Sequence, residues 1–209
     1  MTIVNVTDEI KQELSSSNFS KRFLDNCFNS NFLAIELNNK KIIGVGFVGG
    51  ILNSYGVEII EEFRGKGIGK KLLNEINNKC KKEKFSFLTG VFKPTNTNSV
   101  KMHMSVGYVP LFTFYYNTTE GAEIPVILPF NKKGLFLIKL FKICNTRFGN
   151  FLFALILSFL QPFLKNLIAF SNNEMPKLDL KYCISNFEKV TKTLEKYGVL
   201  EKYLKLLRI

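Results

Sequence analysis

The sequence lacks acidic residues over a long stretch, since no Asp or Glu occurs between Glu123 and Glu174. The whole chain of 209 residues has 29 Lys and Arg against 17 Asp and Glu, a formal net charge of +12. Residues 1–131 hold 15 of these basic and 12 of these acidic residues, and residues 132–209 hold 14 and 5. A positive surplus favours a polyanionic partner, either nucleic acid, an anionic membrane or a phosphorylated ligand. The surplus here belongs to the C-terminal third.

Metal ligands and disulfide partners are also scarce. The four cysteines are far apart, form no C-x-x-C pair, and are accompanied by a single histidine, His103. This spacing predicts neither a zinc cage nor a disulfide framework, and we expect no metal site. The N-terminal segment has acidic residues where a secretory signal would need a basic start and an apolar core. We therefore expect a reducing, cytoplasmic compartment.

Residues 1–131 have the pattern of a mixed α/β domain. A hairpin is indicated by two β-rich runs joined at Asn38-Asn39-Lys40. A third run enters a glycine-rich segment, after which apolar residues recur at helical spacing up to Cys80. A second helix is expected from residue 96 to 106, and Gly107 ends it. Strands are expected at residues 32–37, 41–50, 55–60, 85–92, 108–116 and 124–128.

The glycine-rich segment reads EEFRGKGIG over residues 61–69. A glycine loop between a strand and a helix exposes backbone N–H groups next to the positive end of the helix dipole, where a phosphate can approach closely. The segment lacks the G-x-x-x-x-G-K-[ST] pattern and the G-x-G-x-x-G spacing. Neither a P-loop NTPase nor a Rossmann dehydrogenase is therefore indicated.

Two motifs occur in order in this part of the chain. Arg64, Gly67 and Gly69 fit the pattern [RQ]-x-x-G-x-[GA], and the segment from Asn96 to Tyr108 follows N-x-x-[AS]-x-x-x-Y-x-K-x-G-[FY] at matching spacing. These motifs resemble the two signatures of the GCN5-related N-acetyltransferase (GNAT) superfamily. The resemblance covers residues 1–131 and implies a mixed, mostly antiparallel sheet flanked by helices.

The resemblance also implies a reaction. Acetyl-CoA, or another acyl-CoA, would donate its acyl group to a primary amine that attacks the thioester directly, and the acceptor would be a small molecule or a protein. The expected cofactor-binding residues form the end of a strand, the glycine loop and the start of the second motif. They are Ile59, Ile60, Arg64, Gly65, Lys66, Gly67, Ile68, Gly69, Lys70 and Asn96.

The catalytic positions depart from the family pattern. His103 stands where the family has the Tyr that acts as general acid. It could therefore deliver a proton, act as a base through water, or only cap or pack against its helix. Asn53 stands where some members carry a Glu that acts as general base. The base could then be Glu58 or a water chain, and Glu58 could equally be a surface charge with no catalytic role. These departures leave open an alternative function: a catalytically degenerate acyl-CoA sensor or scaffold at a membrane surface.

Residues 132–209 are expected to form an all-α, apolar and basic extension. Residues 148–164 carry no charge but fall short of the ~20 apolar residues of a spanning helix. The basic residues of 132–170 are interleaved with Phe, which suits an anionic membrane surface and a peripheral place on the inner face. Packing on the domain, a homodimer interface and a true span are the alternatives, and nucleic acid is disfavoured. A one-sided stripe from 186 to 197 predicts a helix, with a last short helix after Gly198.

Overall fold

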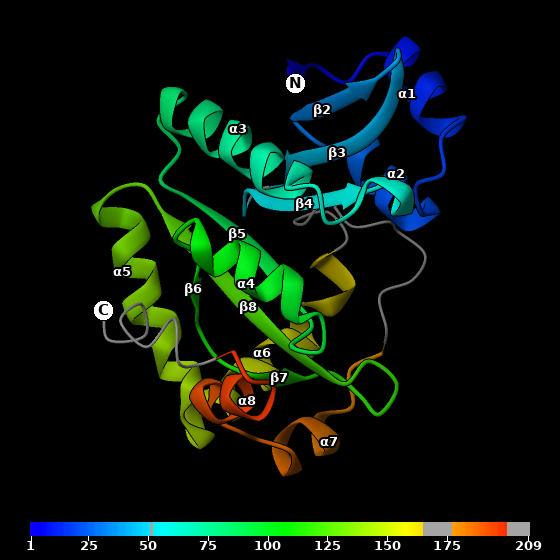
Figure 1. The fold of residues 1–209 in the computed structure, drawn as a ribbon. Coiled ribbons are helices and arrows are strands. Elements are labelled where there is room, and N and C mark those ends of the chain that lie inside the picture. The colour runs from blue at the N-terminus through cyan, green and yellow to red at the C-terminus, as the bar shows by residue number, and fades with distance from the viewer. Residues whose placement is uncertain (51, 165–176, 200–209) are drawn as a thin grey trace. The chain divides into compact units, whose positions relative to one another are not determined.

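The computed structural model describes residues 1–50, 52–164 and 177–199 and has a mixed α/β fold (Figure 1). Within each of the two compact units of the chain the paired strands are antiparallel, and helices flank the strands. The predicted fold class is confirmed. The chain forms two compact units, Met1–Phe85 and Ser86–Phe163 with the described residues after 176.

The first unit contains four strands in sequential order. They are β1 (Thr2–Val4), β2 (Phe32–Asn38), β3 (Lys41–Gly49) and β4 (Ser54–Ile59). The predicted hairpin is present between β2 and β3, where Asn39 and Lys40 both have positive φ, at 49° and 64°. Two central residues with positive φ match the twist of the flanking strands, so this two-residue turn fixes the register of the pair.

Helices cover both faces of this sheet (Figure 1). Helix α3 (Ile68–Lys82) lies on one face, where a Cβ at Gly46 would come within 2.6 Å of Ile76 Cδ1. The next residue, Phe47, points to the other face, and its ring centroid is 5.4 Å from that of Phe23 on α2 (Lys21–Phe28). Helix α1 (Asp8–Ser15) belongs to that second layer. No element was assigned from the sequence to residues 1–31, where β1, α1 and α2 are found.

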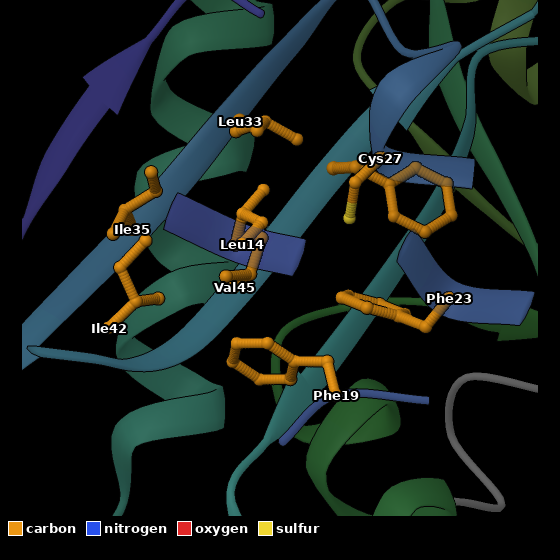
Figure 2. Packing of buried hydrophobic residues seen from close by; sticks show 9 residues of the cluster. Leu14, Phe19, Phe23, Cys27, Leu33, Ile35, Ile42 and Val45 are labelled. Carbon is orange, nitrogen blue, oxygen red and sulfur yellow. The ribbon is translucent and has the colours of Figure 1, made fainter. Parts of the chain in front are cut away.

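Figure 2 shows the hydrophobic cluster that holds α1 and α2 to the sheet. Leu14 is fully buried at its centre. Burial and the nearby Glu58 raise the pKa of the Cys27 thiol, so this cysteine acts as an apolar core residue and not as a nucleophile. The other members are Phe19, Phe23, Leu33, Ile35, Ile42, Val45 and Phe47.

The second unit is built around one long strand, β8 (Ala122–Pro129), which pairs with three others. These are β5 (Phe87–Phe92), β6 (Val109–Pro110) and β7 (Phe114–Tyr115), and α4 (Thr97–Ser105) connects β5 to β6. The sequence predicted one strand over 108–116, and the structure divides it into β6 and β7. After Pro110 the Leu111 N–H still donates to the Pro125 carbonyl of β8 at 3.0 Å, but Pro125 has no N–H to return the bond, so the regular ladder ends there.

The extension begins with helix α5 (Lys132–Phe141), whose N-cap Asn131 accepts hydrogen bonds from the N–H groups of Lys133 and Gly134. A short 3₁₀ turn, η2 (Lys142–Asn145), leads to α6 (Arg147–Leu164). The later helices are α7 (Leu180–Ser185) and α8 (Val190–Lys196). The predicted helix of 186–197 is confirmed as α8, and the last short helix expected after Gly198 falls on residues outside the described ranges.

One side of the extension packs on the strands of the second unit. The Phe153 ring of α6 lies 4.8 Å from that of Phe112 and 5.2 Å from that of Phe114, between centroids. Asn150 Nδ2 donates a hydrogen bond of 2.9 Å to the Thr113 carbonyl oxygen. This Asn, which interrupts an apolar stretch of the sequence, therefore satisfies a buried backbone group.

A buried polar chain fixes α8 to the same strands. The Thr113 and Thr193 hydroxyl oxygens are 2.8 Å apart, and Thr193 donates to Glu188 Oε2 at 2.8 Å. The Tyr115 hydroxyl donates to the same carboxylate oxygen at 3.3 Å. Burial, with Glu188 nearby, raises the pKa of Tyr115 to about 12. Tyr115 therefore stays protonated and donates a hydrogen bond that helps to hold Glu188 in place.

Replacing Leu14 by Ala should destabilise the protein by about 3 kcal/mol, because the cluster loses a fully buried side chain and keeps the cavity. Urea unfolding followed by circular dichroism measures this loss. Leu37→Ala is the matched control, since Leu37 is 51% exposed and its truncation should change stability by no more than about 0.5 kcal/mol. Equal unfolding midpoints for the two variants would contradict the packing described.

Candidate functional site

The glycine loop joins β4 to α3 through a 3₁₀ turn, η1 (Glu61–Phe63). Gly65 and Gly67 have φ of +78° and +77°, a region that side chains with a Cβ rarely adopt. A Cβ built at either glycine would meet nothing within 4 Å. The loop therefore leaves open space above its backbone, where a bulky ligand can approach.

The first turn of α3 offers backbone donors to this space. Gly67 is the N-cap and supplies no side-chain hydrogen bond, unlike the capped helices α1 and α4. The first helical hydrogen bond runs from the Lys71 N–H to the Gly67 carbonyl at 3.2 Å. The N–H groups of residues 68–70 thus precede the helical ladder, at the positive end of the helix dipole. This is a favourable site for a phosphate group.

Two basic side chains of the loop are fixed by contacts within it. Arg64 Nε donates to the Ile59 carbonyl at 3.1 Å. Lys66 Nζ lies 4.7 Å from the centre of the Phe63 ring. Lys70 is exposed on the first turn of α3. These cations add positive potential, and the backbone supplies the directed donors.

The last residues of β4 differ in where their backbone groups point. The Ile60 N–H donates to the Ile43 carbonyl at 3.0 Å, and the Ile60 carbonyl accepts from the Phe63 N–H at 2.9 Å. Ile59, one residue before, lies opposite Gly44 in the register. Backbone groups alternate in direction along an antiparallel strand, so those of Ile59 point away from β3. Of these two predicted cofactor contacts, Ile59 has the suitable direction, although its carbonyl already accepts from Arg64 Nε, and Ile60 is engaged within its own unit.

Glu58 is engaged with the start of α2. Its Oε1 accepts from the Ser20 N–H at 3.0 Å and its Oε2 from the Ser20 hydroxyl at 2.8 Å. Ser20 is the N-cap of α2 and provides no side-chain cap of its own. The carboxylate therefore stabilises a helix N-terminus, a structural role that the sequence spacing of 38 residues between Ser20 and Glu58 did not indicate.

The second motif lies in the other unit, on α4. Asn96 is the N-cap of this helix, and its Oδ1 accepts from the Ser99 N–H at 3.1 Å. The Asn96 side chain is exposed, and its Nδ2 takes no part in this cap bond. Asn96 thus starts α4 and retains amide donors for another group.

His103 is buried, with 7% of its surface exposed. Its ring lies 6.2 Å from that of Phe92 and 5.5 Å from that of Tyr108, between centroids. Its Nδ1 is 2.6 Å from the Ser99 carbonyl oxygen, which can only accept, so Nδ1 carries a proton. Burial lowers the pKa of His103 below its usual value of about 6.5. The imidazole is therefore neutral at pH 7 and holds no surplus proton to deliver there.

The predicted site residues therefore form two groups. One group, from Glu58 to Lys70, lies in the first unit, and Asn96 and His103 lie in the second. Among the described residues, no three His, Cys, Asp or Glu side chains are grouped in a way that could hold a metal ion.

A family model described as Acetyltransferase (GNAT) family matches residues 3–108. The chain belongs to this family. The matched residues contain the glycine loop and the Asn96–Tyr108 motif, so the resemblance read from those motifs is confirmed. In this GNAT protein, the extension from residue 132 lies outside the residues that the family model matches.

Solved structures of similar fold include three acetyltransferases. The ribosomal-protein-S18-alanine N-acetyltransferase from Escherichia coli is 18% identical, with a TM-score of 0.51 and coverage of 62% of this chain and 94% of that one. The IAA acetyltransferase from Bacillus cereus is 18% identical, with a TM-score of 0.50 and coverage of 61% of this chain and 98% of that one. A GNAT acetyltransferase from Elizabethkingia anophelis was solved with acetyl-CoA bound. It is 19% identical, with a TM-score of 0.50 and coverage of 61% of this chain and 97% of that one. No curated protein matches the chain.

The lowered pKa of His103 predicts a pH-dependent stability. Below about pH 6.5 the unfolded chain binds a proton at this residue more readily than the folded chain, so stability should fall as the pH drops from 7.5 to 5.5. The slope from this group cannot exceed about 1.4 kcal/mol per pH unit. Urea unfolding at a series of pH values measures it, and His103→Gln should flatten the profile. An equal slope in both proteins would refute the assignment.

Proposed function

We propose that this GNAT protein is an N-acyltransferase that moves an acetyl group from acetyl-CoA, or another acyl-CoA, to a primary amine. The observation that carries the proposal is the open, uncapped glycine loop at the start of α3. It lies within the family match and has the backbone form that a diphosphate requires. The acetyl-CoA bound to the relative from Elizabethkingia anophelis supports the choice of donor.

The residues present fit this cofactor. The N–H groups of residues 65–70 would hold the diphosphate, and the missing Cβ atoms of Gly65 and Gly67 leave it room. The Ile59 N–H, which points away from β3, would donate to the pantetheine arm, since the Ile59 carbonyl already accepts from Arg64 Nε. When bound, the cofactor supplies an activated acyl thioester.

The chain's own task is to orient this thioester and to manage one proton. The amine nitrogen attacks the carbonyl carbon, a C–N bond forms, the C–S bond breaks, and the proton lost by the amine balances the one gained by the thiolate. The neutral His103 is suited to accept the amine proton through water, because it is uncharged at pH 7 and already oriented by Ser99. The bonds from Ser20 leave Glu58 the weaker candidate.

The acceptor is proposed only as a class. Two of the relatives named above bear names that point to different acceptors. At 18–19% identity the three relatives share the fold with this chain and nothing narrower. A primary amine, on a small molecule or a protein, is the chemistry that a thioester acyl transfer needs.

Replacing Gly67 by Val should abolish acetyl-CoA binding, because the side chain would occupy the open space and strain a residue with positive φ. The measurement is the rise in melting temperature that saturating acetyl-CoA produces. Gly121→Val is the matched control: its φ is +70°, it also has nothing within 4 Å, and it lies outside the loop. Loss of the ligand-induced shift in both variants, or in neither, would oppose the proposed diphosphate site.

Replacing His103 by Gln should lower turnover at least about tenfold with little change in acetyl-CoA affinity, since a proton acceptor is lost while the cradle is untouched. Thiol release against a panel of amines measures the rate, and the melting shift measures the affinity. An unchanged rate would leave His103 with its packing role alone.

A second candidate is a binding module that holds acyl-CoA without transferring its acyl group. The commitment of Glu58 to Ser20 and the burial of His103 favour it. Acetyl-CoA binding with no acceptor-dependent thiol release across the panel would support this sensor and exclude the enzyme.

A further inference from the structure

The second unit exposes an unusual amount of apolar surface on its extension. Of the 15 large hydrophobic side chains that are exposed among the described residues, 11 lie between Leu135 and Phe163, on α5, η2 and α6. We call this set the apolar outer face. Its members are Leu135, Phe136, Leu140, Ile143, Phe148, Phe151, Leu152, Ile156, Phe159, Leu160 and Phe163.

On α6 these residues form a continuous stripe. Phe148, Leu152, Ile156, Phe159 and Phe163 recur every three or four residues, so they share one side of the helix. The opposite side is the one that carries Asn150 and Ala154, 2% and 0% exposed. Both sides of α6 are therefore apolar. One side packs on the second unit, and the other side is exposed. Soluble monomers rarely leave such a patch uncovered.

The charge around the outer face has one sign. Lys132, Lys133, Lys139, Lys142 and Arg147 belong to the same two helices and the turn between them, and the sequence from 124 to 173 contains no acidic residue. Lys132, Lys133, Lys139 and Arg147 are exposed. Long Lys side chains can place their carbon chain along apolar surface and their charge in a polar layer. This combination of aromatic residues with charges of one sign is complementary to an anionic lipid surface.

The same charge argues against a second copy as the occupant. A twofold interface would bring the same basic residues of both copies close together, with no carboxylate in this segment to offset them. A spanning helix is also unsupported. Among the described residues no single helix is long and apolar enough to cross a bilayer, and α5 with η2 passes that test only together with α6, across a bend of 104°.

We propose that the apolar outer face docks on an anionic bilayer surface. The Phe, Leu and Ile side chains of α5, η2 and α6 enter the headgroup and upper acyl region, and the Lys and Arg residues contact the lipid phosphates. The helices lie in the interface and do not cross it. For a protein that encounters acyl-CoA, this is a peripheral position on the cytoplasmic side of the membrane. The docking itself does not depend on acyl transfer.

Vesicle flotation with the full chain tests the proposal. Vesicles of phosphatidylcholine alone are compared with vesicles that contain phosphatidylglycerol, at low and at high salt. We expect binding to the anionic vesicles that weakens as salt rises. No flotation with any vesicle would overturn the proposal, and equal, salt-independent binding to neutral vesicles would overturn its electrostatic part.

Two variant pairs separate the contributions. Lys133→Gln with Lys139→Gln should lower the partition coefficient on anionic vesicles about 30-fold, since each basic residue near the surface is worth about fivefold. Lys21→Gln with Lys41→Gln removes two exposed charges in the first unit and should change it less than about twofold. Equal losses in the two pairs would mean that net charge alone drives binding, and would overturn the assigned surface.

Phe159→Gln with Phe163→Gln should lower binding at least about tenfold at both salt concentrations, because the rings are 71% and 65% exposed and free to insert. Melting temperature and the acetyl-CoA shift should stay at their wild-type values. Sedimentation without lipid tests whether a second copy of the chain occupies this face. A dimer that these two substitutions dissociate would identify a second copy and would overturn the membrane proposal.

Discussion

Close packing over Gly44 determines the shape of the glycine loop. A Cβ at this position would lie 2.8 Å from Ile59 Cδ1, 3.1 Å from Ile68 Cγ2 and 3.2 Å from Leu72 Cδ1. The last residue of β4 and the first residue of α3 therefore meet over one bare backbone position on β3. Because both ends of the loop are held there, the residues between them must turn sharply, and the two positive-φ glycines make that turn. The backbone of the glycine loop therefore depends on this contact between β3, β4 and α3.

The positive charge of the molecule serves two kinds of recognition. In the glycine loop the directed donors are backbone N–H groups, and the side chains of Arg64 and Lys66 are held by contacts within the loop. In the extension the charges stand among exposed Phe and Leu. A loop of the first kind selects one phosphate geometry, whereas a surface of the second kind requires only many negative charges in a plane.

Local signals in the sequence were sufficient for the elements they involve. The hairpin at Asn39 and Lys40 and the helix after Gly67 follow from residues that are neighbours in the chain. Features that depend on distant residues were not predictable. Glu58 has the chemistry of a base, and only the fold brings Ser20 to it. His103 matched a catalytic position, but its burial between Phe92 and Tyr108 and its neutral state depend on tertiary packing.

The extension shows the same limit in another form. From the sequence alone, membrane contact and packing on the domain were competing interpretations of one apolar segment. The structure assigns packing to the side of α6 that carries Asn150 and Phe153, and it leaves the other side exposed. Asn150 is the residue that distinguishes the two sides, since a buried amide needs a partner and finds it in the Thr113 carbonyl. A helix anchored in this way on its inner side presents its outer aromatic residues as a rigid set, and a rigid apolar surface loses little conformational entropy when it is covered.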